Sequence, residues 1–405
     1  MNFVRRFSNC FSRKRIVPVL YKCHSAEQTK NHFSERIFIA RMFYFVALVF
    51  PLKDKYTQIQ QLLHFCLEYG ATLLLSLYII GDFRNLYHLI GFLPMGLIFS
   101  SLFTDIFSIT IRVAILCKRR SILCTLVYLQ DIHSGLQTNK LCNQVSQLAI
   151  GVFLSYVLPG TLMWYTVTMC FPGYEGVLKH YVKYTFYGLS TENKWADCFL
   201  FVITDHLLET QQHILSGFLI VLCWYLLGLL REIVESFSVI AKEEDDLERF
   251  FDAYLRYAKT VSSCVSRVEQ SLSLLLLFLY GFLVFSIFSV TTYLMTAELS
   301  DVPIPMVTSQ LVLLFETIIG FYITSFQAIA VHNVAVKVRN SIYEMVSRSD
   351  SQNYDMKSLL LTMSANYPSG VVITAWGLFS LKNSFLQKTT SGMITYATLL
   401  SQMED

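Results

Sequence analysis

The sequence contains little charge and none of the common motifs of catalytic chemistry. Only 15% of its 405 residues are charged, whereas 54% are hydrophobic, and the mean hydropathy is +0.48. This balance excludes an ordinary soluble domain, because runs of about 20 apolar residues recur along the chain. The sequence has no GxSxG elbow, no HExxH helix and no Walker loop. We therefore expect a membrane protein that is not an enzyme, carries no cofactor and binds no nucleic acid.

Paired metal ligands, glycosylation signals and a signal peptide are missing as well. The ten cysteines include no CxxC pair and no cysteine–histidine cluster at metal-ligand spacing, so we expect no metal site. No Asn-x-Ser/Thr sequon marks a glycosylated surface. The apolar run 16–21 is too short to be a signal peptide, is broken by Pro18, and lies in a basic segment. The N-terminus is therefore predicted to stay in the cytosol.

What the chain does contain is a series of apolar segments of membrane length. Seven transmembrane helices are predicted, at about 61–81, 89–116, 147–171, 198–230, 272–297, 309–332 and 383–403. The fourth is longer than a bilayer requires and begins with acidic residues, so its depth stays open. The shorter apolar segment 37–50 holds Arg41, which favours an interfacial or re-entrant helix within a cytoplasmic segment 1–60. The predicted fold class is all-α, a polytopic membrane protein with one seven-helix domain over 61–403.

The basic residues give this domain an orientation. With the N-terminus inside, the predicted inner segments carry 26 lysines and arginines and the predicted outer segments carry 4. Such a bias marks the cytoplasmic side. The C-terminus is therefore predicted to be extracellular, which is the reverse of a G-protein-coupled receptor.

Two of the inner segments continue the helical pattern of their spans. Within 247–272, apolar residues recur every three or four positions, and the acidic tract 243–246 suits the helix start. The pattern repeats more weakly after the sixth span, at Val334, Val338, Ile342 and Met345. Both segments are predicted to be cytosolic helical extensions. The pattern leaves open whether they pack within one chain or between subunits.

The last segment, 383–403, carries a continuous polar stripe. Since each helical residue turns about 100°, six polar residues share one narrow face: Ser384, Lys388, Ser391, Thr395, Thr398 and Gln402. The stripe either lines a water-filled pore or packs against polar faces of other helices. The charge of Lys388 would repel cations in a pore. Its side chain is therefore expected to extend toward the inner mouth or to pair with an acidic partner. Tyr396 lies off the stripe and is expected to contact another helix.

A family resemblance appears at this end of the chain. Thr395-Tyr396, five further residues and Gln402 resemble the terminal Thr-Tyr…Gln-Phe signature of arthropod gustatory receptors, with Met403 in place of the phenylalanine. The segment 375–381 (AWGLFSL) is similar to the one that precedes the last span in that family, and 41–52 matches more loosely.

The resemblance implies a seven-helix chemoreceptor related to odorant receptors. It implies a ligand-gated, non-selective cation channel in the plasma membrane of sensory neurons, opened by a small tastant such as a sugar or bitter compound, or by a metabolite. It also implies a homo- or heterotetramer of like subunits, with the last helix lining the pore.

Acidic residues within the spans are candidates for a ligand pocket, because each costs about 2.5–3.5 kcal/mol at a helix centre and needs a reason. Aromatic residues are predicted at a comparable depth in the outer half of the bundle. The candidate pocket residues are Phe92, Trp164, Tyr165, Asp205, Glu209, Tyr293, Phe315 and Glu316. Aromatic faces with acceptors suit a polyol or a cationic alkaloid. Alternatively, the acids pair with other helices or lie in an outer loop.

The sequence leaves two further points open. Cys170 and Cys198 flank a predicted outer loop and could form a disulfide, which spacing alone does not establish. A transporter with a midplane substrate site is an alternative function, although the chain shows no internal repeat. A G-protein-coupled type of receptor is disfavoured by the predicted topology.

Overall fold

The computed structural model describes scattered positions between 70 and 87, then 95–135, 170, 193–204, 210–243, 247–296, 304–348 and 354–403. These residues form helices and one short hairpin. The helices are α4 (Met95–Gly135), α7 (Lys194–Thr204), α8 (Thr210–Glu243), α9 (Leu247–Thr296), α10 (Ile304–Arg348), α11 (Tyr354–Gly370) and α12 (Asn383–Met403). The hairpin consists of β1 (Thr374–Ala375) and β2 (Phe379–Ser380), which pair antiparallel.

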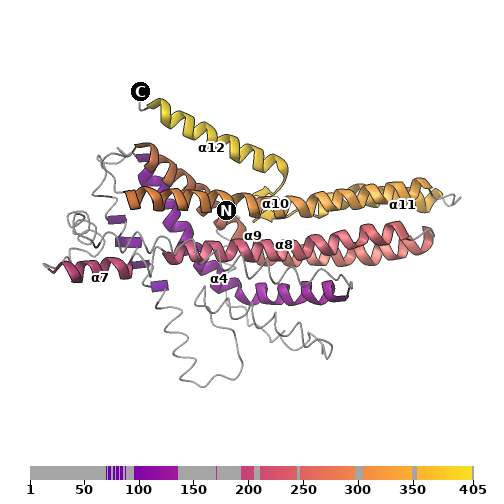
Figure 1. Cartoon of the computed structure of the whole chain (residues 1–405). Helices are drawn as coiled ribbons and strands as arrows, with labels where there is room; N and C mark the ends of the chain where they lie inside the picture. The colour runs from indigo at the N-terminus through magenta and orange to yellow at the C-terminus, as the bar shows by residue number, and fades with distance from the viewer. Residues whose placement is uncertain are drawn as a thin grey trace, which may run out of the picture.

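Four long helices make the body of the molecule (Figure 1). Within the described part of the chain, α4, α8, α9 and α10 are long and apolar enough to cross a membrane. Together with residues of α11 and the hairpin, they form one core of buried aliphatic and aromatic side chains. The all-α, polytopic fold class predicted from the sequence is therefore confirmed.

The last helix is a different kind of element. Its bounds, Asn383–Met403, coincide with the predicted final segment, and 21 residues give a length of about 31 Å. This matches a hydrocarbon core of about 30 Å. Its composition nevertheless places it outside the four apolar candidates, because the polar stripe lowers its mean hydropathy.

The remaining predicted spans are described only in part. The described residues between 70 and 81 are helical, and helical residues continue to 87, into the predicted first outer loop. The third predicted span, 147–171, lies outside the described residues except for Cys170, as does the interfacial segment 37–50. The fourth corresponds to α7 and α8, with 205–209 between them outside the described residues.

All four long helices continue beyond the predicted inner ends of their spans. For α9 and α10 this confirms the predicted extensions, and Val334, Val338, Ile342 and Met345 are buried within the chain. The packing within one chain that the sequence left open is therefore present. The extensions of α4 to Gly135 and of α8 to Glu243 were not predicted, nor was α11.

Polar contacts join the helices in this inner part of the bundle. The buried His133 Nε2 on α4 lies 2.6 Å from Glu232 Oε2 on α8. The Tyr257 hydroxyl on α9 lies 2.9 and 2.7 Å from the carbonyl oxygens of Ile233 and Val234. These residues fix α4, α8 and α9 together below the apolar spans.

Candidate functional site: a polar helix face and a buried polar cluster

The apolar side of α12 is held against the bundle at both ends. Near its start, the Phe385 ring stacks on Phe379 of β2 at 4.5 Å and meets Tyr280 of α9 edge-on at 5.3 Å. Near its end, the Tyr396 ring lies 4.5 Å from that of Phe288, and its hydroxyl lies 2.7 Å from Thr292 Oγ1. These contacts fix which side of α12 faces the protein.

Two further contacts agree with that assignment. The Thr390 hydroxyl lies 3.2 Å from the Tyr322 hydroxyl on α10. A Cβ added at Gly96 of α4 would lie 3.1 Å from the Tyr396 hydroxyl oxygen, so only a small residue lets α4 approach here. The expectation that the Tyr396 hydroxyl contacts another helix is therefore confirmed.

The polar stripe of α12 lies on the opposite, exposed side. All six of its residues are exposed: Ser384, Lys388, Ser391, Thr395, Thr398 and Gln402. The Thr395 and Thr398 hydroxyls donate to the carbonyl oxygens of Ser391 and Ile394, at 2.9 and 3.0 Å. Their protons are thus bonded within the helix, while hydroxyl lone pairs remain on the exposed face. Lys388 forms no ion pair with any residue that the structure describes.

The hairpin fixes the N-terminal end of α12 to α9. Glu269 Oε1 accepts from the Thr374 backbone N–H at 3.2 Å and from its hydroxyl at 2.9 Å. One turn further along α9, the Ser273 hydroxyl accepts from the Trp376 N–H at 3.0 Å.

The turn of this hairpin has an uncommon backbone. Trp376 and Gly377 both have positive φ, of 53° and 72°, which is the pattern of a type I′ turn. Non-glycine residues adopt this conformation infrequently. The segment 375–381, singled out in the sequence by its family resemblance, is therefore a structured connector between α11 and α12.

A second candidate site lies at the contact between α8 and α10. Gly320 of α10 lets Ile220 of α8 approach, since an added Cβ would lie 2.5 Å from its Cδ1. The two helices run in the same direction because α9 returns between them. Ser216 and Glu316, each one turn before that contact, therefore lie at the same level and are both buried.

Other buried polar residues lie within about one helical turn of Ser216 or Glu316 along the same two helices. Gln212 and His213 are buried on α8, Thr317 is buried on α10, and the His213 ring meets Phe282 of α9 edge-on at 5.7 Å. Among the described residues, Gln212 Nε2, His213 Nδ1 and Glu316 Oε2 have no hydrogen-bond partner. We refer to Gln212, His213, Ser216, Glu316 and Thr317 as the polar cluster. Buried polar groups are normally paired with hydrogen-bond partners, so the unpaired atoms of this cluster require an explanation.

Of the predicted pocket residues that the structure describes, only Glu316 belongs to the polar cluster. Glu316 is 9% exposed and belongs to the polar cluster, whereas Phe315 is 64% exposed. Phe315 lies on an outward apolar face of α10 with Leu311, Ile319, Ile323 and Phe326. Neighbouring helical residues point about 100° apart, so these two predicted pocket residues lie on different sides of α10, and the predicted pocket stays a prediction.

The other predicted pocket residues are not brought into this cluster. Tyr293 is half-buried on α9. Phe92, Trp164, Tyr165, Asp205 and Glu209 lie outside the described residues. Sequence reasoning missed Ser216 and Thr317, because hydroxyl residues in a span are common and carry no distinguishing pattern.

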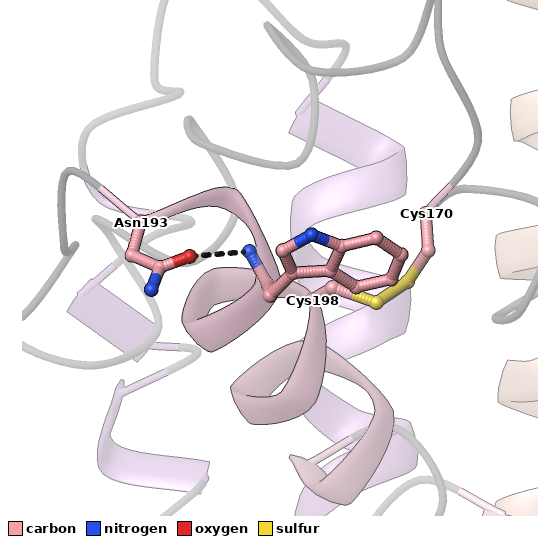
Figure 2. The surroundings of a disulfide bond; sticks show 4 residues. Cys170, Asn193 and Cys198 are labelled. Atoms are coloured by element: carbon pink, nitrogen blue, oxygen red, sulfur yellow. Dashed lines mark hydrogen bonds between the residues drawn. A yellow bond between two sulfur atoms is a disulfide. The ribbon is translucent and has the colours of Figure 1, made fainter.

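The cysteines that flank the predicted outer loop are joined in the structure (Figure 2). Cys170 and Cys198 form a disulfide with a Cα–Cα separation of 5.6 Å. Cys198 lies on α7. The first turn of this helix is capped by Asn193, because the Asn193 Oδ1 accepts a hydrogen bond from the Trp195 N–H at 3.0 Å. Within the described residues, no group of histidines, cysteines and carboxylates is arranged to hold a metal ion.

Comparison with known proteins gives a fold but no close sequence relative. No protein-family model matches the sequence, and no curated protein is similar enough to match. Two solved structures of the insect olfactory receptor OR5 from Machilis hrabei match at 15% identity, with TM-scores of 0.62 in complex with eugenol and 0.63 without it. Each covers 92% of this chain and 99% of the receptor. The chain therefore has the fold of an insect olfactory receptor, as its resemblance to the related gustatory receptors predicts.

Proposed function

We propose that the chain is a subunit of a ligand-gated, non-selective cation channel, a chemoreceptor of gustatory-receptor type in the plasma membrane of sensory neurons. The observation that carries this proposal is the face of α12 on which all six stripe residues are exposed. A helix of membrane length exposes such a face to water or to polar partners, since lipid offers its hydroxyls and amide no hydrogen bonds. Hydroxyl and amide oxygens also suit a path for hydrated cations.

The stripe implies an oligomer. One chain places one such helix at its surface, and a single helix cannot enclose a pore. Several like subunits, four according to the family resemblance, would bring their α12 helices around a common axis. Homomers and heteromers fit equally. In the proposed orientation, with the C-terminus outside, Gln402 lies at the outer mouth and Lys388 near the inner mouth.

We also propose that the polar cluster between α8 and α10 belongs to the ligand site. Glu316, Gln212 and His213 offer hydrogen-bonding atoms that no described residue satisfies. A small ligand with its own polar groups would satisfy them, and its differential affinity for two arrangements of the helices would shift the closed–open equilibrium. The ligand-bound state of the similar olfactory receptor, which holds eugenol, makes a small organic ligand a reasonable starting class.

A ligand panel on cells expressing this chain alone tests the proposal. Sugars, bitter compounds and small aromatic alcohols would be applied under voltage clamp. At least one is expected to evoke a current that reverses near zero potential, and Gln402→Ala or Thr395→Ala is expected to change its ion permeability. Unchanged permeation, gating and surface expression in both variants would contradict the pore assignment. Substrate-coupled flux without channel currents would instead favour the transporter alternative.

Adjacent residues of α10 give a matched pair for the ligand site. Glu316→Gln keeps the shape of a buried residue but removes its charge, whereas Phe315→Leu changes an exposed one. We expect Glu316→Gln to shift the half-maximal ligand concentration by about tenfold or more, the effect of one charged hydrogen bond. Phe315→Leu should leave it within about twofold, an effect well below one hydrogen bond. Equal shifts for the two variants would remove Glu316 from the site.

A further inference from the structure

A polar cavity lies between the inner parts of α4 and α9, away from α12 and from the polar cluster. Its volume is about 570 Å³. Five hydroxyl side chains contribute to its walls: Ser121, Thr125, Ser262, Ser263 and Ser266. In Figure 1 the C-terminal part of α4 and α12 lie on opposite sides of the described helices, so contacts between α12 helices do not occupy this face.

The charge of the cavity is all of one sign. Lys259 and Arg267 line it, together with Cys124 and Gln270, and no carboxylate is among the lining residues that the structure describes. Neither Lys259 nor Arg267 forms an ion pair with any residue that the structure describes. A third cation, Lys118, donates to the Gln270 carbonyl oxygen at 2.9 Å, at one end of the cavity. Three unneutralised cations around one polar space favour an anionic occupant.

The cavity wall is held in place by its own contacts. The Arg267 guanidinium lies over the Tyr128 ring at 4.0 Å from its centroid. The Tyr128 hydroxyl in turn donates to Ser263 Oγ at 3.1 Å. The stacking leaves the edge of the guanidinium, which carries its N–H donors, free to pair with an oxyanion. Arg267 is therefore positioned before any ligand binds, which lowers the entropic cost of binding.

We propose that this cavity binds a phosphorylated anion, with Lys259 and Arg267 as its charge partners and the surrounding hydroxyls as additional donors. A phosphate monoester carries close to two negative charges at neutral pH and three acceptor oxygens, which matches several cations and hydroxyls better than a carboxylate does. The volume accommodates an organic phosphate rather than a bare ion.

Two sources could supply this chemistry. In the proposed orientation, the Gln270 end of the cavity lies just inside the inner membrane surface, where polyphosphorylated lipid headgroups project. A soluble cytosolic organophosphate could enter from the other end. Only the lipid source depends on the proposed orientation, and the binding itself does not depend on channel activity.

Binding to the purified full-length chain separates these outcomes. The probes are phosphatidylinositol bisphosphate, scored as lipid adducts by native mass spectrometry, and soluble inositol trisphosphate, measured by calorimetry. Lys259→Gln with Arg267→Gln is expected to weaken binding by about tenfold or more. The matched control is Lys337→Gln with Arg348→Gln, which removes the same charge from exposed positions on α10.

A second variant tests the same site if the double variant does not fold. Ser121→Glu keeps both cations but places a carboxylate in the cavity, and it is expected to weaken binding as well. Binding of both probes points to a general phosphate site, and binding of the lipid alone points to the headgroup. No binding of either probe, or equal loss in the Lys337/Arg348 control, overturns the proposal. Since no current is measured, failure of the channel proposal leaves this result interpretable.

Discussion

Adjacent residues of α12 have opposite roles, and this is clearest at Thr395 and Tyr396. Thr395 is exposed on the polar stripe, whereas the Tyr396 hydroxyl reaches Thr292 of α9 and its ring packs on Phe288. The helical periodicity of the sequence predicts that these two residues lie on different sides of α12, because that prediction depends only on the angle between neighbouring positions. It does not identify Thr292 or Phe288 as partners, since contacts between distant helices leave no periodic pattern in the sequence.

The difference between these neighbours can be measured as stability. Tyr396→Phe loses one hydrogen bond, a cost of about 0.5–1.5 kcal/mol. Tyr396→Ala also loses the ring contact with Phe288, and such an aromatic pair contributes about 0.5–1.5 kcal/mol beyond the area that it buries. We expect the melting temperature of the purified chain to fall in that order, with Thr395→Ala close to wild type. Equal effects of Tyr396→Ala and Thr395→Ala would place Tyr396 on the wrong side.

At the scale of elements, regular periodicity was predictable and breaks in it were not. The bounds of α12 and the extension of α9 follow from apolar spacing. The continuation of α4 beyond residue 116 was not predicted, because Lys118, Arg119 and Arg120 resemble the end of a span. The continuation of α8 beyond Leu230 was not predicted either, because Arg231 and Glu232 interrupt the apolar run. In the structure these charged residues lie on long helices whose opposite faces remain buried.

The hairpin is the element whose loss should affect α12 most directly. Glu269 holds Thr374 through two hydrogen bonds to a charged acceptor, and such bonds contribute about 1.5–3 kcal/mol. We expect Glu269→Ala to lower the melting temperature of the purified chain and Glu269→Gln to lower it less, because the amide oxygen still accepts.

Asp252→Ala provides the control for Glu269, because it removes an exposed carboxylate from the same helix. It is expected to have little effect, as the Asp252 contact to Arg256 uses its backbone oxygen. If Glu269→Ala and Asp252→Ala are equally mild, the hairpin is not fixed through Glu269.

At the scale of the whole molecule, the fold is shared with a receptor of only 15% identity. The fold is therefore retained although most aligned residues differ. Hydrophobic composition and the recurring apolar runs were sufficient to predict a polytopic helical protein. The polar cluster depends on which faces of α8 and α10 meet, and only the structure supplies that.

The proposed orientation predicts which cysteines a membrane-impermeant maleimide reaches. Cys124 is exposed on the inner part of α4, whereas Cys264 is buried on α9. Burial raises the pKa of the Cys264 thiol to about 11, so at neutral pH it holds almost none of the reactive thiolate. Cys124 should be labelled in permeabilised cells only, and Cys264 in neither preparation.

Peptide mass spectrometry identifies the labelled cysteine, and Cys124→Ala is the control that removes its signal. Labelling of Cys124 on intact cells would reverse the orientation. Labelling of Cys264 at neutral pH would show that the N-terminal part of α9 separates from its neighbouring helices far more readily than its packing indicates.

Substituted cysteines give the most direct test of whether the exposed face of α12 lines the ion pathway. Thr395→Cys and Ala397→Cys differ by two positions, with Thr395 exposed on the stripe and Ala397 half-buried. A charged, water-soluble thiol reagent would be applied during a ligand-evoked current, with wild type as the control for native cysteines. We expect rapid block of Thr395→Cys and no added block of Ala397→Cys. Block at Ala397→Cys alone, or at neither position despite surface expression and current, would contradict it.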